Sequence, residues 1–260
     1  MRYGICTNID NIELLENAGY DYIEMSVSSI MSLTMDEFEG LVDRINASKI
    51  RCEACNILFP KTMRLIGPEV NQDELHQYLV EVMNRISKIG CKVVVFGSGK
   101  CRMIPKGYDF KKAYTELICV FRLTGEIAKA YGITVVIEPL SRIETNFINT
   151  MQEGALLEAA INHPNVKLLS DYYHVISNHD SILDMEFIGS FAHIHIAAGN
   201  GRLYPVSEEN EQYAEYIKVL KKIGYEGRIS IEGKTENIKE DAVKALTLLK
   251  RMEMEAYEES

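Results

Sequence analysis

Short, β-rich apolar runs alternate repeatedly with longer amphipathic runs along this sequence. Strands that alternate with helices form parallel sheets, and eight βα pairs favour a closed barrel over an open sheet. The expected strands are residues 2–6, 20–26, 50–57, 91–97, 133–138, 165–171, 191–196 and 228–232.

Glycines mark the ends of the expected helices. Gly19, Gly90, Gly132 and Gly224 each stand just before an expected strand, where a residue in the left-handed conformation ends a helix. No Pro-, Gly- or Ser-rich linker divides the chain. The sequence therefore predicts an α/β protein with one domain, a (β/α)8 TIM barrel over residues 1–260.

Charge and composition exclude several classes of partner. A net charge of -10 argues against nucleic-acid binding, which depends on clustered Lys and Arg. The opening segment MRYGICTNID lacks the apolar stretch of a signal peptide, and no run of about 18 apolar residues predicts a membrane span. We expect a cytoplasmic protein. Its CxxC pair, Cys52 and Cys55, is interpreted as two buried small side chains.

Two connections are unusually long, LFPKTMRLIGPEVNQ after the third expected strand and GSGKCRMIPKGYD after the fourth. Both follow strands, so they belong to the carboxyl-end face on which barrel enzymes place their active sites. Active-site loops and purely structural loops are equally compatible with these two segments.

Four successive strands end in ionisable residues, which are costly to bury unless they are paired or bind a metal. Any one of them alone is more often a satisfied structural group. Four on neighbouring strands at the same rim indicate a functional site. These residues are Glu138 after ITVVI, Asp171 after VKLLS, His195 in FAHIHI and Glu232 after RISI.

Side-chain alternation along the strands predicts where these groups point. In RISIE the two isoleucines share one face, and Glu232 lies on the other. The same parity turns Glu138, His193 and His195 toward the barrel axis. His195 is nearer the carboxyl rim and is the better metal ligand, whereas His193 is expected to support the site or to belong to the core.

Three carboxylates and one imidazole make a hard, mostly oxygen ligand set. Such a set favours Mn²⁺, Mg²⁺ or Co²⁺, while Zn²⁺ stays open. A metal there can polarise a carbonyl and hold an adjacent hydroxyl. Two of the carboxylates can then serve as acid and base.

Five motifs in this order carry a resemblance to a known family. They are VVVFGSGKCRMIP, IEPLSRIETNFINT, DYYH, HIHIAAGNGRLYP and GYEGRISIE. Across most of its length the chain resembles the xylose isomerase-like TIM-barrel superfamily of sugar phosphate isomerases and epimerases. Within it, the chain looks most like the D-tagatose and D-psicose 3-epimerase group.

The resemblance implies a divalent-metal-dependent ketose 3-epimerase acting on a small sugar or sugar derivative. Glu138, Asp171, His195 and Glu232 match the metal ligands of the family. Glu138 and Glu232 also match its two catalytic carboxylates, which move the C3 proton of a ketose through an enediolate. Glu144, His174 and Arg202 match residues that bind the reacting end of the sugar. Assembly into a homo-oligomer stays open.

Other functions remain compatible with the same residues. They are an aldose–ketose isomerase, a barrel dehydratase or lyase acting on a cyclic polyol or keto acid, and a barrel that binds sugar without turnover. The loop AAGNGR lacks the acidic residue that many relatives carry there. Lys100, Arg102 and Lys234 add positive charge near the expected mouth, so free, phosphorylated and carboxylated substrates all stay open.

Overall fold

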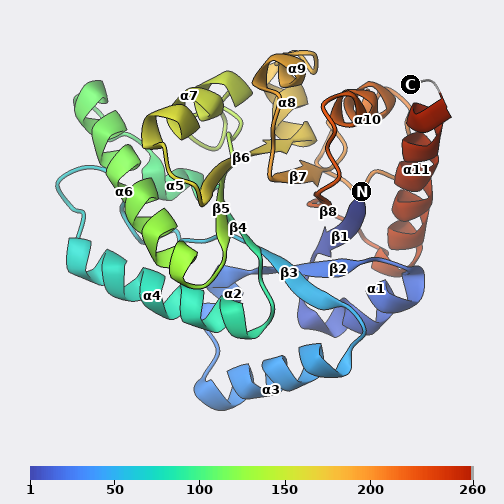
Figure 1. Ribbon diagram of the computed structural model, residues 1–260, viewed down its shortest axis with the longest axis horizontal. Helices are drawn as coiled ribbons and strands as arrows, with labels where there is room; N and C mark the ends of the chain where they lie inside the picture. Colours follow the sequence, from blue (N-terminus) through green and yellow to red (C-terminus); the bar gives the residue numbers. More distant parts are fainter. Residues whose placement is uncertain (259–260) are drawn as a thin grey trace.

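The computed structural model describes residues 1–258 and shows a closed barrel of parallel strands, arranged in the order of the sequence (Figure 1). The strands are β1 (Arg2–Cys6), β2 (Tyr22–Ser26), β3 (Arg51–Asn56), β4 (Val93–Phe96), β5 (Thr134–Ile137), β6 (Val166–Asp171), β7 (His193–Ile196) and β8 (Arg228–Ile231). Strand β8 pairs with β1 and closes the ring. The predicted TIM barrel is confirmed, and the predicted strands differ from these mainly at their ends.

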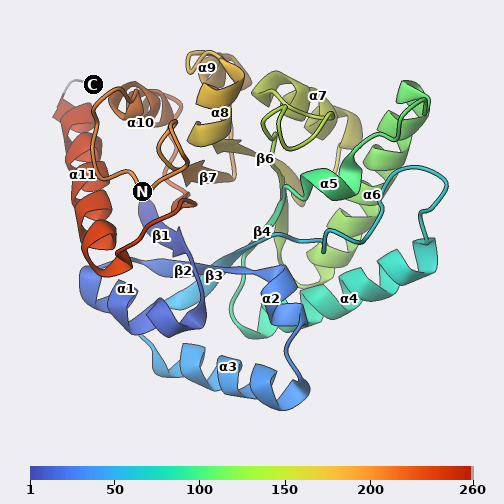
Figure 2. The same cartoon turned by 180° about the vertical axis from the view of Figure 1, so that it is seen from behind.

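Helices surround the barrel on all sides, as the view from behind also shows (Figure 2). They are α1 (Ile12–Ala18), α2 (Val27–Met31), α3 (Met35–Ala47), α4 (Gln72–Lys88), α5 (Gly99–Arg102), α6 (Phe110–Ala130), α7 (Met151–Ile161), α8 (Tyr172–Asn178), α9 (Asp184–Ile188), α10 (Tyr213–Lys222) and α11 (Ile238–Glu258), with a 3₁₀ turn η1 (Ile9–Asn11). The four glycines before the strands have positive φ, as predicted.

Side-chain alternation separates two apolar layers. Ile229 and Ile231 of β8 are fully buried in the large core between strands and helices. A smaller cluster, which includes Tyr22 and Val136, fills the inside of the barrel. Gly4 makes room there, because a Cβ at this position would lie 2.4 Å from the Tyr22 ring. The alternation expected from the sequence is therefore correct.

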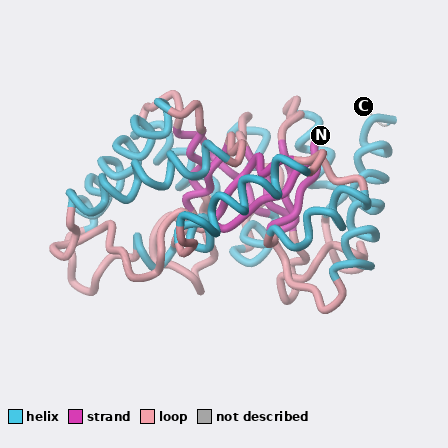
Figure 3. The backbone as a smooth tube through the Cα atoms, turned by 90° about the horizontal axis from the view of Figure 1, so that it is seen from below, coloured by secondary structure: helices cyan, strands magenta, loops and turns pink. Residues whose placement is uncertain are grey.

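The longer loops gather at the end of the barrel opposite the N-terminus (Figure 3). Among residues 1–258 no helix is long and apolar enough to cross a membrane. Cys52 and Cys55 are both buried, as expected, with their sulfur atoms 3.8 Å apart.

Arg102 corrects one expectation from the sequence, because it does not contribute charge to the mouth of the barrel. Its side chain is fully buried. The guanidinium donates to the carbonyl oxygens of Phe96 at 3.1 Å, Glu138 at 2.8 Å and Ile148 at 3.3 Å. Arg102 thus joins the end of β4 to the segment that follows β5.

Candidate metal centre

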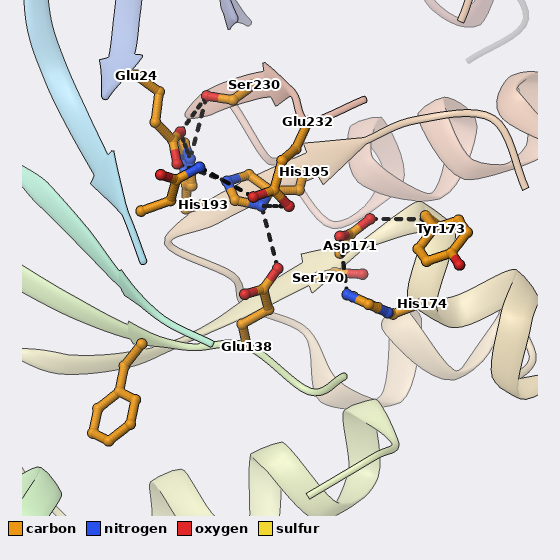
Figure 4. A network of polar contacts seen from close by, with 12 residues as sticks. Glu24, Glu138, Ser170, Asp171, Tyr173, His174, His193, His195, Ser230 and Glu232 are labelled. Carbon is orange, nitrogen blue, oxygen red and sulfur yellow. Dashed lines mark hydrogen bonds and ion pairs between the residues drawn. The ribbon is translucent and has the colours of Figure 1, made fainter. Parts of the chain in front are cut away.

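The carboxyl ends of β5, β6, β7 and β8 bring four predicted residues together (Figure 4). Glu138, Asp171, His195 and Glu232 each offer one ligand atom, and all four atoms lie within 4.8 Å of one another. Adjacent parallel strands end at a common rim, so residues that are distant in sequence meet there. The sequence prediction that these side chains share one site is matched by this geometry.

Local structure sets the direction of two of these carboxylates. Glu138 follows β5 and lies against Gly97, where a Cβ would approach its Oε2 to 2.0 Å. Only glycine at position 97 leaves space for that carboxylate. Asp171 ends β6 and is the N-cap of α8, with Oδ1 accepting from the Tyr173 N–H at 2.9 Å.

His195 is held from below by a carboxylate that the sequence analysis missed. Its Nε2 lies 2.9 Å from Oε1 of Glu24, and Nε2 of His193 lies 2.8 Å from Oε2 of the same residue. Glu24 lies in β2 and is fully buried. A lone carboxylate in the apolar run YIEMS was the available signal, equal to the one that revealed Glu138. Of the two expectations for His193, support of the site or membership of the core, this contact favours the first.

The other ring nitrogen of His195 faces the carboxylate cluster. Its Nδ1 lies 3.3 Å from Oε1 of Glu138 and 3.2 Å from Oε2 of Glu232. Burial disfavours charged His195, but the carboxylates of Glu24 and Glu232 raise its pKa well above the usual value. A metal bound at Nδ1 would displace the proton there and leave Nε2–H donating to Glu24. A carboxylate behind the ring is the usual arrangement for a metal-binding histidine.

Arg202 inserts its guanidinium among the carboxylates. It donates to Glu232 and, at 3.1 Å, to Oδ2 of Asp171, and its Nη1 lies 3.3 Å from Glu144. Asn56 at the end of β3 also donates to Glu232, at 3.0 Å. Both Arg202 and Glu144, predicted to bind the reacting end of a substrate, therefore lie at the cluster.

His174 completes the predicted set. Its Nδ1 accepts from the Ser141 N–H at 3.0 Å, which fixes the ring. Its buried Nε2 has no hydrogen-bond partner within residues 1–258 and lies 3.5 Å from Oδ2 of Asp171. This nitrogen is available to a ligand beside Asp171.

The surrounding groups shift the pKa values of Glu138 and Glu232 in opposite directions. Burial, and then the charge of Glu232, raise the pKa of Glu138 above its usual value. Burial also disfavours ionised Glu232, but the positive charges of His195 and Arg202 hold its pKa at about 2. Two carboxylates with opposite shifts are a common feature of acid–base sites.

A cavity of about 390 Å³ opens over the cluster. Residues from both long connections line it together with two residues of the cluster, Glu138 and Glu232. The full lining is Ile57, Phe59, Lys61, Ser98, Gly99, Lys100, Cys101, Glu138, Leu140, Ile143, Glu144, Arg202 and Glu232. Among them Ile57, Ser98 and Arg202 have positive φ, which is rare outside glycine. Backbone of this kind gathers at functional sites.

The donor set fits a single divalent ion. Ligands at about 2.1 Å from one ion lie about 4.2 Å apart when they are on opposite sides of it. The spacing of the four ligand atoms, all within 4.8 Å, agrees with this requirement. Repulsion among the three carboxylates is also reduced by the guanidinium of Arg202, which contacts Asp171 and Glu232.

The model of the family "Xylose isomerase-like TIM barrel" matches residues 12–252. This chain belongs to that family. Among curated relatives, the L-ribulose 3-epimerase of Methylomonas sp. strain DH-1 is 25% identical over 85% of this chain and 76% of its own length. The D-psicose 3-epimerase of Ruminiclostridium cellulolyticum is 30% identical over 49% of this chain, and the match spans only 43% of that relative.

Among solved structures, D-psicose 3-epimerase from Clostridium cellulolyticum H10 with D-tagatose has a TM-score of 0.85 to this chain. It is 20% identical, and the match covers 97% of this chain and 99% of that one. At this identity the likeness establishes the shared fold.

Proposed function

We propose that this protein is an isomerase-type enzyme that depends on a divalent metal, and that it acts as a ketose 3-epimerase. The observation that carries the proposal is the convergence of Glu138, Asp171, His195 and Glu232 beneath a cavity of ligand size. The epimerase relatives support the type of reaction.

The four clustered residues would hold the metal ion. When bound, the ion polarises the ketose carbonyl and so makes the neighbouring C–H more acidic. Mn²⁺, Mg²⁺ and Co²⁺ suit the oxygen-rich donor set best.

Glu138 and Glu232 would move the proton. They follow β5 and β8, three positions apart around a ring of eight strands, and therefore approach a bound sugar from different directions. One removes the proton from C3 to give an enediolate, and the other delivers a proton to the opposite face. Arg202, Glu144 and His174 orient the oxygens at the reacting end.

The test is turnover of ketoses in deuterated water by the metal-loaded enzyme, followed by NMR. We expect solvent deuterium at C3 of the product. Glu138→Gln and Glu232→Gln should each lower kcat by about 10²- to 10⁴-fold, the usual contribution of a general acid or base. The exposed Glu236 lies four residues beyond Glu232, and Glu236→Gln serves as the matched control. Full activity of both cluster variants contradicts the proposal.

Two neighbouring reactions use the same residues. Aldose–ketose isomerisation would place deuterium at C1 or C2 instead of C3, and dehydration would release water. The position of the label therefore separates these alternatives, and binding without any exchange would indicate a barrel that only binds sugar.

A further inference from the structure

Positive and negative side chains are unevenly distributed over the lining of the cavity above the cluster. The carboxylates of Glu138, Glu144 and Glu232 line its inner part together with Arg202. Two lysines, Lys61 and Lys100, line it as well, and both are exposed. The remaining lining is largely apolar.

The ammonium groups of these two lysines have no carboxylate partner in the described protein. Within residues 1–258 neither ammonium group forms an ion pair with a carboxylate. Arg202, in contrast, is already engaged by Asp171, Glu144 and Glu232. The chain has 38 acidic and 28 basic residues, so most positive side chains can find a carboxylate partner. Two lysines without such a partner at one cavity are therefore a distinctive feature.

Their placement comes from two separate long connections. Lys61 lies between β3 and α4, and Lys100 lies in α5, which follows β4. The connections are tied together, because the Arg64 guanidinium donates to the Lys100 carbonyl at 3.1 Å and the Leu65 N–H donates to the Cys101 carbonyl at 3.0 Å.

We propose that the substrate carries an anionic group, phosphate or carboxylate, at the end away from its reacting carbons, and that Lys61 and Lys100 bind this group. The inference rests on the proposed function, which places the reacting carbons at the carboxylate cluster. The ammonium groups of the lysines attract an anionic group to the outer part of the cavity, so they also favour one direction of substrate entry. Lysine binds phosphate and carboxylate as a compact point charge.

The test compares three ketoses that share the same C1–C3 end: D-fructose, D-fructose 6-phosphate and D-fructuronate. We expect kcat/KM of the metal-loaded enzyme to be at least tenfold higher for one of the anionic sugars than for D-fructose. The phosphate and the carboxylate arms identify which anion is preferred. This preference should weaken as NaCl is added, because exposed charges are screened.

Lys61→Met and Lys100→Met remove each charge and retain most of the side-chain length. In each variant kcat/KM should fall about tenfold more for the preferred anionic sugar than for D-fructose. Lys106→Met is the matched control, because Lys106 is an exposed lysine of the same β4–α6 connection that does not line the cavity. An equal or higher kcat/KM for D-fructose, with ratios unchanged by the lysine variants, would overturn the anion site and leave the epimerase proposal standing.

Calorimetry distinguishes failure of the proposed epimerase function from failure of the proposed anion site. If none of the three sugars is converted, binding of D-fructose 6-phosphate and D-fructuronate to the metal-loaded protein is measured directly. Weaker binding of either sugar by Lys61→Met and Lys100→Met, with Lys106→Met unchanged, supports the anion site even then. Equal binding of both sugars by all variants overturns it.

Discussion

The two halves of the barrel contribute differently to the site. All four clustered residues lie at the carboxyl ends of β5–β8, whereas the two long connections after β3 and β4 supply one wall of the cavity. The first half also supplies support from behind, through Glu24 and Asn56. In this barrel the groups proposed for chemistry and those proposed for substrate selection are therefore largely separate along the sequence. Substitutions of the four clustered residues in the second half should change turnover and metal binding, whereas substitutions of Lys61 and Lys100 in the first half should change substrate preference.

The largest expected effect lies in the second half. Asp171→Asn or His195→Ala should remove most of the bound divalent metal, because each loses one ligand of a four-residue set. Elemental analysis of the purified proteins measures this, with Lys100→Met as the control from the first half. Wild-type and variant proteins that are equally free of metal would contradict the proposed centre.

Arg102→Met tests how firmly the halves are joined. The substitution leaves three buried carbonyl oxygens without their guanidinium partner, at Phe96, Glu138 and Ile148. We expect the free energy of unfolding to fall by on the order of 3 kcal/mol. Denaturant titration gives the value. The exposed neighbour Lys100, substituted by Met, should change it by less than about 0.5 kcal/mol. A similarly small change for Arg102→Met would show that the buried guanidinium contributes little.

Glu24→Gln changes a residue of the first half that contacts two histidines of the second half. It retains the shape of the side chain but removes the charge that faces His195 and His193. Metal affinity should fall by about 10- to 100-fold, as is typical when the partner of a metal-binding histidine is altered. Calorimetric titration with Mn²⁺ measures the change, with far-UV circular dichroism as the control for folding. Unchanged affinity would limit Glu24 to a structural role.

Arg202→Ala should have the smallest effect of the four. Guanidinium is not a metal ligand under ordinary conditions but offers fixed donors to oxygens. We expect KM to rise about tenfold, equivalent to about 1.4 kcal/mol, while metal content stays constant. Kinetics and elemental analysis on the same preparation distinguish the two effects. Kinetics identical to those of the wild type would show that Arg202 only neutralises the carboxylates.

Local patterns in the sequence were enough to predict the barrel and the common rim of the four residues at its strand ends. Hydrophobic periodicity defines strands and helices locally, and parallel closure then requires that Glu138, Asp171, His195 and Glu232 share one rim. Their chemistry could therefore be inferred before any contact was known. The glycines before the strands were readable for the same local reason, since their left-handed φ ends a helix.

Which other side chains reach the site depends on contacts between segments that are distant in sequence. Glu24 lies 171 residues from His195, and no local pattern pairs the two. Arg102 and Lys100 are close neighbours in sequence, yet one is fully buried and the other lines the cavity. Long loops take their conformation from contacts with distant segments, so the direction of a loop side chain is set by the packed molecule and not by residue spacing.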